Sequence, residues 1–263
     1  MKNISLSFVI PVYNEQDRID LTFKALKELS LPRGLTLKEI IFVNDGSTDK
    51  TATLIEKSPL SKKYTVKLLS YSLNMGKGFA LKQGMLQASG DYSLFFDADM
   101  STPLTELKKF MPALKNNVQV IIGTRKNGHS TVTKHQPLHR ELMGKGFTLI
   151  TRIAISSNVT DFTCGFKAFS KSAKNLIFTD SMINRWGYDA EIVYLAARSS
   201  LKIQEIPVLW ANDERTKVRL IPAIMSTFIE LGLIIWNHRL KRYFSAVLQP
   251  RTALHSSSSN LIK

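Results

Sequence analysis

The sequence predicts an α/β domain whose mostly parallel sheet carries helices on both faces. Apolar, strand-like runs alternate with helix-like segments through the first half of the chain. Polar residues follow the ends of those runs, where parallel sheets bind their ligands. The chain has 263 residues, of which 44% are hydrophobic and 22% charged, so it is long enough to bury a sizeable core.

Each element of the first half follows from local patterning. Ile19, Phe23, Leu26 and Leu29 recur on one face of a predicted helix. Short apolar runs bounded by turn residues indicate buried strands. The predicted strands are 5–12, 40–43, 66–69, 92–96 and 118–123, and the predicted helices are 15–29, 50–57, 79–88 and 104–114.

The second half is less regular. Residues 126–137 are polar and favour a loop, and residues from 249 onward favour a disordered tail. The basic runs 167–174 and 238–242 are typical of solvated faces, and beside an apolar helix they also suit anionic lipid. The remaining expected elements are helices 139–155, 188–198 and 221–243 and strands 161–169 and 203–210.

The chain divides into three predicted regions: the α/β domain at 1–217, a membrane-associating helical segment at 218–248 and the disordered tail at 249–263. The apolar run 220–236 contains Pro222 and Glu230, and it falls short of the roughly 20 apolar residues that a membrane span needs. We therefore expect this segment to lie at the membrane surface rather than to cross it.

The net charge predicts an anionic partner. The chain has 36 Lys and Arg against 21 Asp and Glu, a net +15, which suits phosphates, acidic lipid headgroups or nucleic acid. No nucleic-acid-binding motif accompanies the charge, so nucleic acid is not expected. The single cysteine, Cys164, excludes an internal disulfide and a zinc site built from cysteines.

The sharpest chemical feature is Asp97-Ala98-Asp99, which directly follows a predicted buried strand. Carboxylates two residues apart at a strand end can converge on one hard cation, which would neutralise a departing diphosphate. Two solvated turn aspartates are the alternative.

Three further motifs follow strands or open helices. Pro11-Val12-Tyr13-Asn14-Glu15 offers Tyr13 for stacking on a base, or it is ordinary strand-to-helix punctuation. Asp45 is placed to accept from a base or a ribose hydroxyl, or it caps a helix. Gly76-Lys77-Gly78 opens a helix, where free N–H groups favour phosphate, or it is a simple glycine turn.

In order and spacing these four motifs resemble the family 2 glycosyltransferases of GT-A fold. Further segments resemble the polyprenyl-phosphate sugar synthases within that family: 123–125, 140–145, 161–167, 186–191 and 205–208. Trp210 resembles the glucosyl branch, and it is followed by Ala211 where the mannosyl enzymes carry an arginine. Arg215-Thr216 replaces the usual Gly-Ser before Lys217, which departs from the glucosyl pattern.

The resemblance implies residue roles. Pro11, Tyr13, Glu15, Val43 and Asp45 would form the nucleoside pocket. Asp97, Ala98 and Asp99 would line the diphosphate, with Asp97 and Asp99 holding Mg²⁺ or Mn²⁺ and Asp99 as the principal ligand. Lys77 is expected on the donor because it opens a helix. Arg125 and Lys217 would hold phosphate, and Arg140 joins them because it lies on a basic helix.

The implied reaction transfers a hexose, glucose from UDP-glucose, to a polyprenyl or dolichyl phosphate with inversion. The reaction would take place on the cytoplasmic face of a membrane, to which the protein is expected to attach peripherally. An integral membrane protein is expected as a further partner. GDP-mannose as donor and a glycan hydroxyl as acceptor are the alternatives. Asp189 is either near the acceptor or structural, and it is not expected to face the core together with Glu191.

Overall fold

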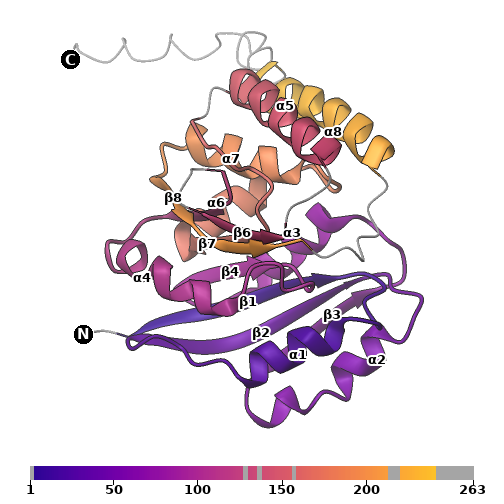
Figure 1. Cartoon of the computed structure of the whole chain (residues 1–263), viewed down its shortest axis with the longest axis vertical. Helices are drawn as coiled ribbons and strands as arrows, with labels where there is room; N and C mark the ends of the chain where they lie inside the picture. The colour runs from indigo at the N-terminus through magenta and orange to yellow at the C-terminus, as the bar shows by residue number, and fades with distance from the viewer. Residues whose placement is uncertain (1–2, 127–129, 135–137, 156–157, 213–219, 241–263) are drawn as a thin grey trace, which may run out of the picture.

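The computed structural model describes residues 3–126, 130–134, 138–155, 158–212 and 220–240. Within these ranges one sheet has seven strands in the order β3-β2-β1-β4-β7-β5-β8 (Figure 1). All neighbours are parallel except β7, which runs antiparallel to β4 and β5. The predicted α/β class is therefore confirmed. The strands are β1 Ile4–Val12, β2 Leu35–Asp45, β3 Val66–Tyr71, β4 Tyr92–Phe96, β5 Val120–Thr124, β7 Phe166–Ser170 and β8 Ile203–Pro207.

Helices cover both faces of the sheet. One face carries α1 Ile19–Lys27, α2 Thr51–Glu56 and α4 Leu107–Lys115, with the short turns η1 Pro59–Lys62 and η2 Leu104–Glu106. The other face carries α3 Lys77–Gln87, α6 Lys171–Asp180 and α7 Tyr188–Arg198. Helices α5 Leu138–Ile155 and α8 Leu220–Ile235 contact each other and pack outside α7 (Figure 1). The π-helical turn η3 Trp236–Leu240 follows α8.

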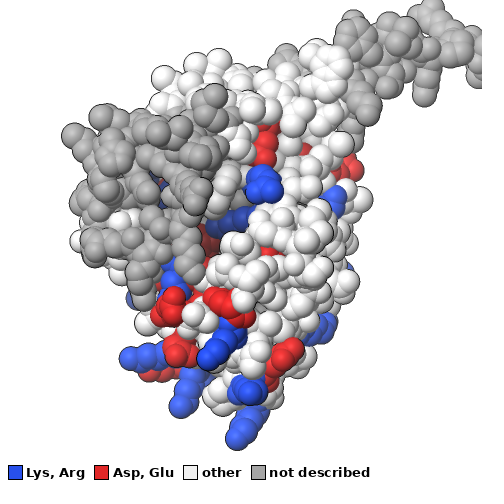
Figure 2. Space-filling model, turned by 90° about the vertical axis from the view of Figure 1, so that its right-hand side faces the viewer, with Lys and Arg blue, Asp and Glu red and all other residues white. Residues whose placement is uncertain are grey.

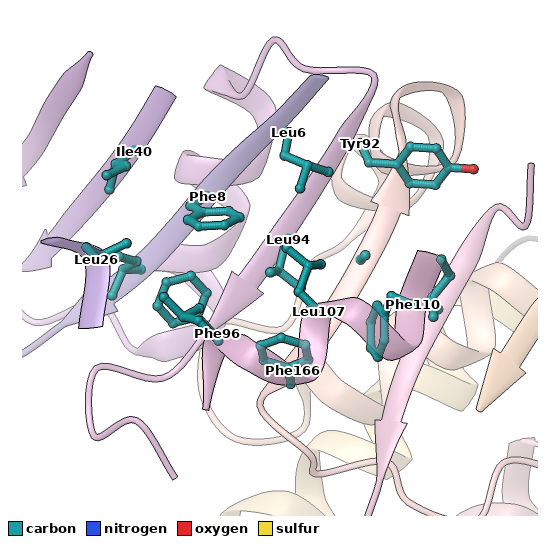
Figure 3. Close-up of a cluster of buried hydrophobic side chains, with 14 of the residues drawn as sticks. Leu6, Phe8, Leu26, Ile40, Tyr92, Leu94, Phe96, Leu107, Phe110 and Phe166 are labelled. Atoms are coloured by element: carbon teal, nitrogen blue, oxygen red, sulfur yellow. The ribbon is translucent and has the colours of Figure 1, made fainter. Parts of the chain in front are cut away.

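The hydrophobic core consists of two clusters, one on each face of the sheet. Alternate residues of a strand point to opposite faces, so Phe8 and Ile10 join one cluster and Val9 the other. Figure 3 shows the first cluster, in which the Phe8 and Phe96 rings meet edge to face with centroids 5.4 Å apart. Complete burial of Phe8, Phe96 and Phe110 contributes on the order of 2 kcal/mol each.

Two predicted strands are shorter than expected. The predicted strand 161–169 is replaced by β7 Phe166–Ser170, and residues 161–165 precede it as a turn, in which Gly165 packs against Asp97. The predicted strand 203–210 divides at Pro207: β8 ends there, and β9 Leu209–Ala211 joins a separate two-stranded sheet. Its partner is β6 Thr131–Lys134, a strand inside the predicted loop 126–137.

Predicted surface positions in the second half are buried. Lys167 and Lys174 belong to the run predicted to be a solvated basic face, yet both are inaccessible, and α6 was not predicted. Asp189 and Glu191 are both buried in α7, contrary to the expectation that they could not both face the interior. Residues two apart point to opposite sides of a helix, and α7 packs against α3 and α6 as well as against α5 and α8.

The C-terminal helix begins as predicted. Pro222 lies in the first turn of α8, where its missing N–H costs little, so it does not break the helix. The α-helix ends at Ile235, before the predicted limit at 243, and continues as the π-helical turn. Among the described helices, none is long and apolar enough to cross a bilayer. The predicted tail at 249–263 lies outside the described residues.

Candidate donor-binding site

The predicted donor residues meet at one edge of the sheet. Strands β2, β1 and β4 are parallel neighbours, so their carboxyl ends lie side by side. Asp45 ends β2, Tyr13 follows β1 and Asp97 follows β4. The edge thus gathers residues far apart in the sequence, as expected for a ligand site of a parallel sheet.

Asp45 is buried and holds the loop that leads into α3. Its carboxylate accepts hydrogen bonds from Asn74 Nδ2 at 2.9 Å, from Met75 N at 2.8 Å and from Gly76 N at 3.0 Å. Charge-assisted bonds of this kind are among the stronger hydrogen bonds in proteins. Asp45 therefore shapes the start of α3, in addition to its predicted contact with the nucleoside.

The glycines around Lys77 are required by close backbone packing. Gly76 precedes α3 with φ of 106°, a conformation that favours glycine. A Cβ on Gly76 would lie 2.4 Å from Asn184 O, and one on Gly78 would lie 2.5 Å from Ile183 O. These contacts place Lys77 in the first turn of α3, at the sheet edge.

Lys77 and Asp97 form an ion pair. Lys77 Nζ lies 2.6 Å from Asp97 Oδ1. Burial would lower the pKa of Lys77, but the charges of Asp97, Asp189 and Asp99 and the hydrogen bond to Asp97 together outweigh it, so the pKa is raised. Gly165 packs against the same carboxylate, and a Cβ there would lie 2.2 Å from Asp97 Oδ2. The helix start, the strand end and the 161–165 turn thus converge on Asp97.

Asp99 lies beside this pair in an electrostatically unfavourable position. Its carboxylate accepts from Ser101 N at 2.9 Å. Burial and the nearby charge of Asp97 together raise the pKa of Asp99. A divalent cation would relieve this repulsion, and carboxylate oxygens are the ligands that Mg²⁺ and Mn²⁺ prefer. Asp97 and Asp99 therefore fit the predicted metal.

The predicted nucleoside-pocket residues differ in accessibility. Tyr13 is exposed, so its ring is available for stacking. Glu15 is buried and pairs with Arg18. Pro11 is half-buried and lies in register with Val43, whose side chain packs in the core beneath α3. Ala98, also buried, accepts through its carbonyl from Thr22 Oγ1 at 2.7 Å.

Arg125 is held rigidly beside the site. Its guanidinium donates to both oxygens of Asp161, at 2.7 and 2.8 Å, and to Thr163 Oγ1 at 2.9 Å, and it lies 5.0 Å from the Trp210 ring. Burial would raise the pKa of Asp161, but Arg125 outweighs it and holds the pKa at about 2. The sequence motifs contain Asp161 and Trp210, but their contact with Arg125 was not predicted.

Asp189 lies between two lysines. Its Oδ1 is 2.5 Å from the buried Lys167 Nζ, which also donates to Cys164 O at 2.7 Å. Burial raises the pKa of Asp189, although the charges of Lys167 and Lys77 act in the opposite direction. Burial raises the pKa of Cys164 to about 12, so its thiol stays neutral. Lys167 was not predicted as part of this cluster, because a lysine in a basic run normally faces water.

Two predicted phosphate-binding residues, Arg140 and Lys217, cannot be placed relative to this site. Arg140 belongs to α5, but its side chain is outside the described part of the chain. Lys217 falls in the undescribed range 213–219. Their roles stay predictions. The described site therefore consists of the Lys77, Asp97 and Asp99 group with Arg125 beside it.

Solved structures share this architecture. Glucosyl-3-phosphoglycerate synthase from Mycobacterium tuberculosis in complex with UDP has a TM-score of 0.65 and 19% identity, over 88% of this chain and 80% of that one. The same enzyme with Mn²⁺, UDP-glucose and phosphoglyceric acid has a TM-score of 0.64 and 20% identity, over 88% and 79%. At this identity the likeness establishes the GT-A fold alone.

Sequence relatives extend over most of the chain. Dolichyl-phosphate beta-glucosyltransferase ALG5D of Trichomonas vaginalis is 31% identical, covering 90% of this chain and 75% of that protein. The dolichyl-phosphate beta-glucosyltransferase of Dictyostelium discoideum is 34% identical, over 82% of this chain and 69% of that protein. The one of Saccharomyces cerevisiae is 33% identical, over 89% of this chain and 74% of that protein. The family model described as "Glycosyl transferase family 2" matches residues 7–177. With the donor-site geometry above, these matches show that the chain is a glycosyltransferase belonging to family 2.

Proposed function

We propose that this enzyme transfers glucose from UDP-glucose to a polyprenyl or dolichyl phosphate. The observation that carries the proposal is the group of Lys77, Asp97 and Asp99, which combines two carboxylates with an ammonium at a helix start. Such a group suits a diphosphate with a divalent cation. The relatives named dolichyl-phosphate beta-glucosyltransferases support the choice of sugar and acceptor.

Asp97 and Asp99 would hold Mg²⁺ or Mn²⁺. Within the described ranges no group of three or more His, Cys, Asp or Glu side chains converges on one point, so oxygens of the donor would complete the coordination. Such an ion would supply positive charge that stabilises the departing diphosphate. Lys77 adds a second positive charge at the same place. Solved neighbours of the same fold that contain Mn²⁺ or Mg²⁺ with UDP support this assignment.

The nucleoside would lie over the ends of β1 and β2. Exposed Tyr13 would stack on the uracil ring. Asp45 would keep the loop before α3 in place and accept from the nucleoside. Pro11, Glu15 and Val43 would shape the pocket, while Ala98 would line the diphosphate.

The acceptor needs positive charge more than a base. The second pKa of a phosphate monoester is about 6, so near neutral pH its oxygen is already an anionic nucleophile. That oxygen forms a bond to the anomeric carbon while the bond from that carbon to UDP breaks, and the electron pair leaves with UDP. A single displacement inverts the anomeric configuration. Arg125, Arg140 and Lys217 would hold the acceptor phosphate.

The lipid acceptor would be reached from a membrane surface on the cytoplasmic side. Helices α5 and α8 expose apolar side chains, of which Ile153 is 72% and Ile229 64% exposed. Figure 2 shows charged residues gathered in the lower half of one face, whereas the described surface at the top, where α5 and α8 lie, is mostly uncharged. The exposed apolar residues, named here the apolar outer face, are Leu149, Ile150, Ile153, Phe228, Ile229, Leu233, Trp236 and Leu240.

A donor and acceptor panel tests the proposal. Labelled UDP-glucose and GDP-mannose would each be offered with a short polyprenyl phosphate, with the matching polyprenol, and with a soluble glycan. We expect lipid-extractable label from UDP-glucose and the phosphate alone. Label from GDP-mannose would assign a mannosyltransferase, and label on the polyprenol or the glycan would assign a hydroxyl acceptor; either result rejects the proposal.

A further inference from the structure

The segment 182–187, between α6 and α7, forms a wall against the start of α3. Phe79 N donates to Asn184 O at 3.0 Å. The positions that Cβ atoms would take on Gly76 and Gly78 lie within 2.5 Å of backbone oxygens of this segment. With backbone packed on backbone, little room remains for adjustment. The position of Lys77 between the two glycines therefore depends on where the 182–187 segment lies.

A buried carboxylate in α7 fixes one end of this segment. Glu191 accepts from Met182 N and Ile183 N, each at 2.9 Å. The same carboxylate lies 2.7 Å from Nε2 of His238, which is buried in η3. Arg198 in turn donates to the carbonyl of His238. One side chain thus joins the 182–187 segment to the turn that ends the C-terminal helix.

A second buried carboxylate fixes the other end. Glu230, the one charged residue of helix α8, accepts from Gly187 N at 2.6 Å. A Cβ on Gly187 would lie 2.8 Å from Glu230 Cβ, so helix and segment are in direct contact. A buried carboxylate is costly unless it is hydrogen-bonded, and its bonds are directional. Both carboxylates accept hydrogen bonds from the backbone of the 182–187 segment.

We propose that Glu191, Glu230 and His238 are positioning residues for the donor site. Through the 182–187 segment they set the place of the turn around Lys77, and they link that turn to the helix that carries part of the apolar outer face. Binding of lipid to that face would then change the affinity of the diphosphate site for its ligand. The identity of the lipid and of the diphosphate rests on the proposed function. The mechanical link between α8 and α3 is independent of the proposed function.

Amide hydrogen exchange of the full-length protein tests the link directly. In His238→Phe, which removes the bond to Glu191, we expect exchange to rise at least fivefold both in 182–187 and in 76–80. His238→Gln, which keeps a donor for Glu191, should restore protection in both. Glu39→Gln, in a network at the opposite end of the sheet, is the control for general destabilisation. Increased exchange confined to 182–187 would overturn the proposal.

Affinity for UDP with Mn²⁺ gives the second reading. We expect the Kd for UDP to rise at least fivefold in His238→Phe and in Glu230→Met, and to stay near the parent value in His238→Gln and Glu39→Gln. Adding anionic vesicles should lower the Kd in the parent, in His238→Gln and in Glu39→Gln, but not in His238→Phe or Glu230→Met. An unchanged Kd in folded His238→Phe and Glu230→Met would overturn the proposal. If His238→Phe does not fold, both readings are taken on Glu230→Met. If the parent binds no UDP, the proposed donor is wrong, and hydrogen exchange still decides the link.

Discussion

Lys77 Nζ lies 2.6 Å from Asp97 Oδ1, and Gly165 packs against the other oxygen of the same carboxylate. The ion pair joins the start of α3 to the end of β4, so the position of the lysine that is predicted to bind phosphate depends on the position of a predicted metal ligand. Gly165 is the residue that leaves room for it, since a Cβ there would lie 2.2 Å from Asp97 Oδ2.

Gly165→Ala should therefore displace Asp97 and impair the donor site. We expect at least a tenfold loss of kcat/KM for the donor and weaker binding of UDP with Mn²⁺, while circular dichroism shows an intact fold. Gly146→Ala in α5, where a Cβ meets open space, is the matched control. Normal kinetics in Gly165→Ala would show that the position of Asp97 does not matter.

Variants of Asp189 distinguish a phosphate acceptor, which needs no general base, from a hydroxyl acceptor, which needs one. Asp189→Asn leaves the buried Lys167 without its carboxylate, which should cost about 3–5 kcal/mol of stability. Asp189→Asn combined with Lys167→Met should be more stable than the single variant, as chemical denaturation would show. If no general base is needed, the double variant keeps turnover within about tenfold of the parent. A well-folded double variant with kcat reduced by several orders of magnitude and an unchanged acceptor KM would identify Asp189 as a base.

The apolar outer face should bind lipid. Ile153→Gln with Ile229→Gln is expected to release the protein from anionic vesicles in a flotation assay, because exposed apolar contacts with the lipid are lost. UDP affinity measured without vesicles should not change. Leu21→Gln, at an exposed leucine on α1, should float like the parent. Raised salt should weaken but not abolish binding of the parent. Resistance of the parent to carbonate extraction would contradict peripheral attachment.

Glu39 gives a pH-dependent contribution to stability away from the donor site. Burial would raise its pKa, but hydrogen bonds from Lys67, Ser89 and Ser7 lower it from the usual 4.5 to about 2. A group whose pKa is lower in the folded state stabilises that state above pH 4.5, and the contribution disappears as pH falls towards 2.

Glu39→Gln should accordingly lower the free energy of unfolding by about 2 kcal/mol at pH 7, and the difference from the parent should shrink between pH 5 and pH 2. Urea denaturation across this range measures it. Glu56→Gln, at an exposed glutamate of α2, should change the free energy of unfolding little at any pH. A difference that stays constant with pH would place the stabilisation elsewhere than in the Glu39 charge.

The regular first half of the fold follows from sequence because local pattern and burial agree there. Residues 5–12 and 92–96 are short apolar runs, and they form central strands of the sheet. Asp97 and Asp99 were found in the same way, since they follow a buried strand. The parallel sheet then brings Asp45 and Tyr13 to the same edge without any further information.

The second half depends on long-range contacts that a local pattern does not contain. Lys167 looks like a surface residue until its partner, 22 positions away, is known. Glu191 and Glu230 look like solvated charges, because the amide groups that satisfy them lie in another segment. Strand 203–210 divides after Pro207 through long-range contacts: Val208 N still donates to Thr124 O of β5, whereas Leu209 N donates to Glu106 and residues 209–211 pair with β6.

Metal-assisted glucosyl transfer is measured as the amount of lipid-extractable glucose formed from labelled UDP-glucose and dolichyl phosphate, in the parent and in Asp99→Asn. We expect product in the parent that chelator abolishes and Mg²⁺ or Mn²⁺ restores. Asp99→Asn should lose about a hundredfold or more, because the leaving diphosphate loses a ligand of its cation. Asp20→Asn, at an exposed aspartate of α1, should match the parent. Transfer at the parental rate by folded Asp99→Asn, or no lipid-linked glucose from the parent, would contradict the account.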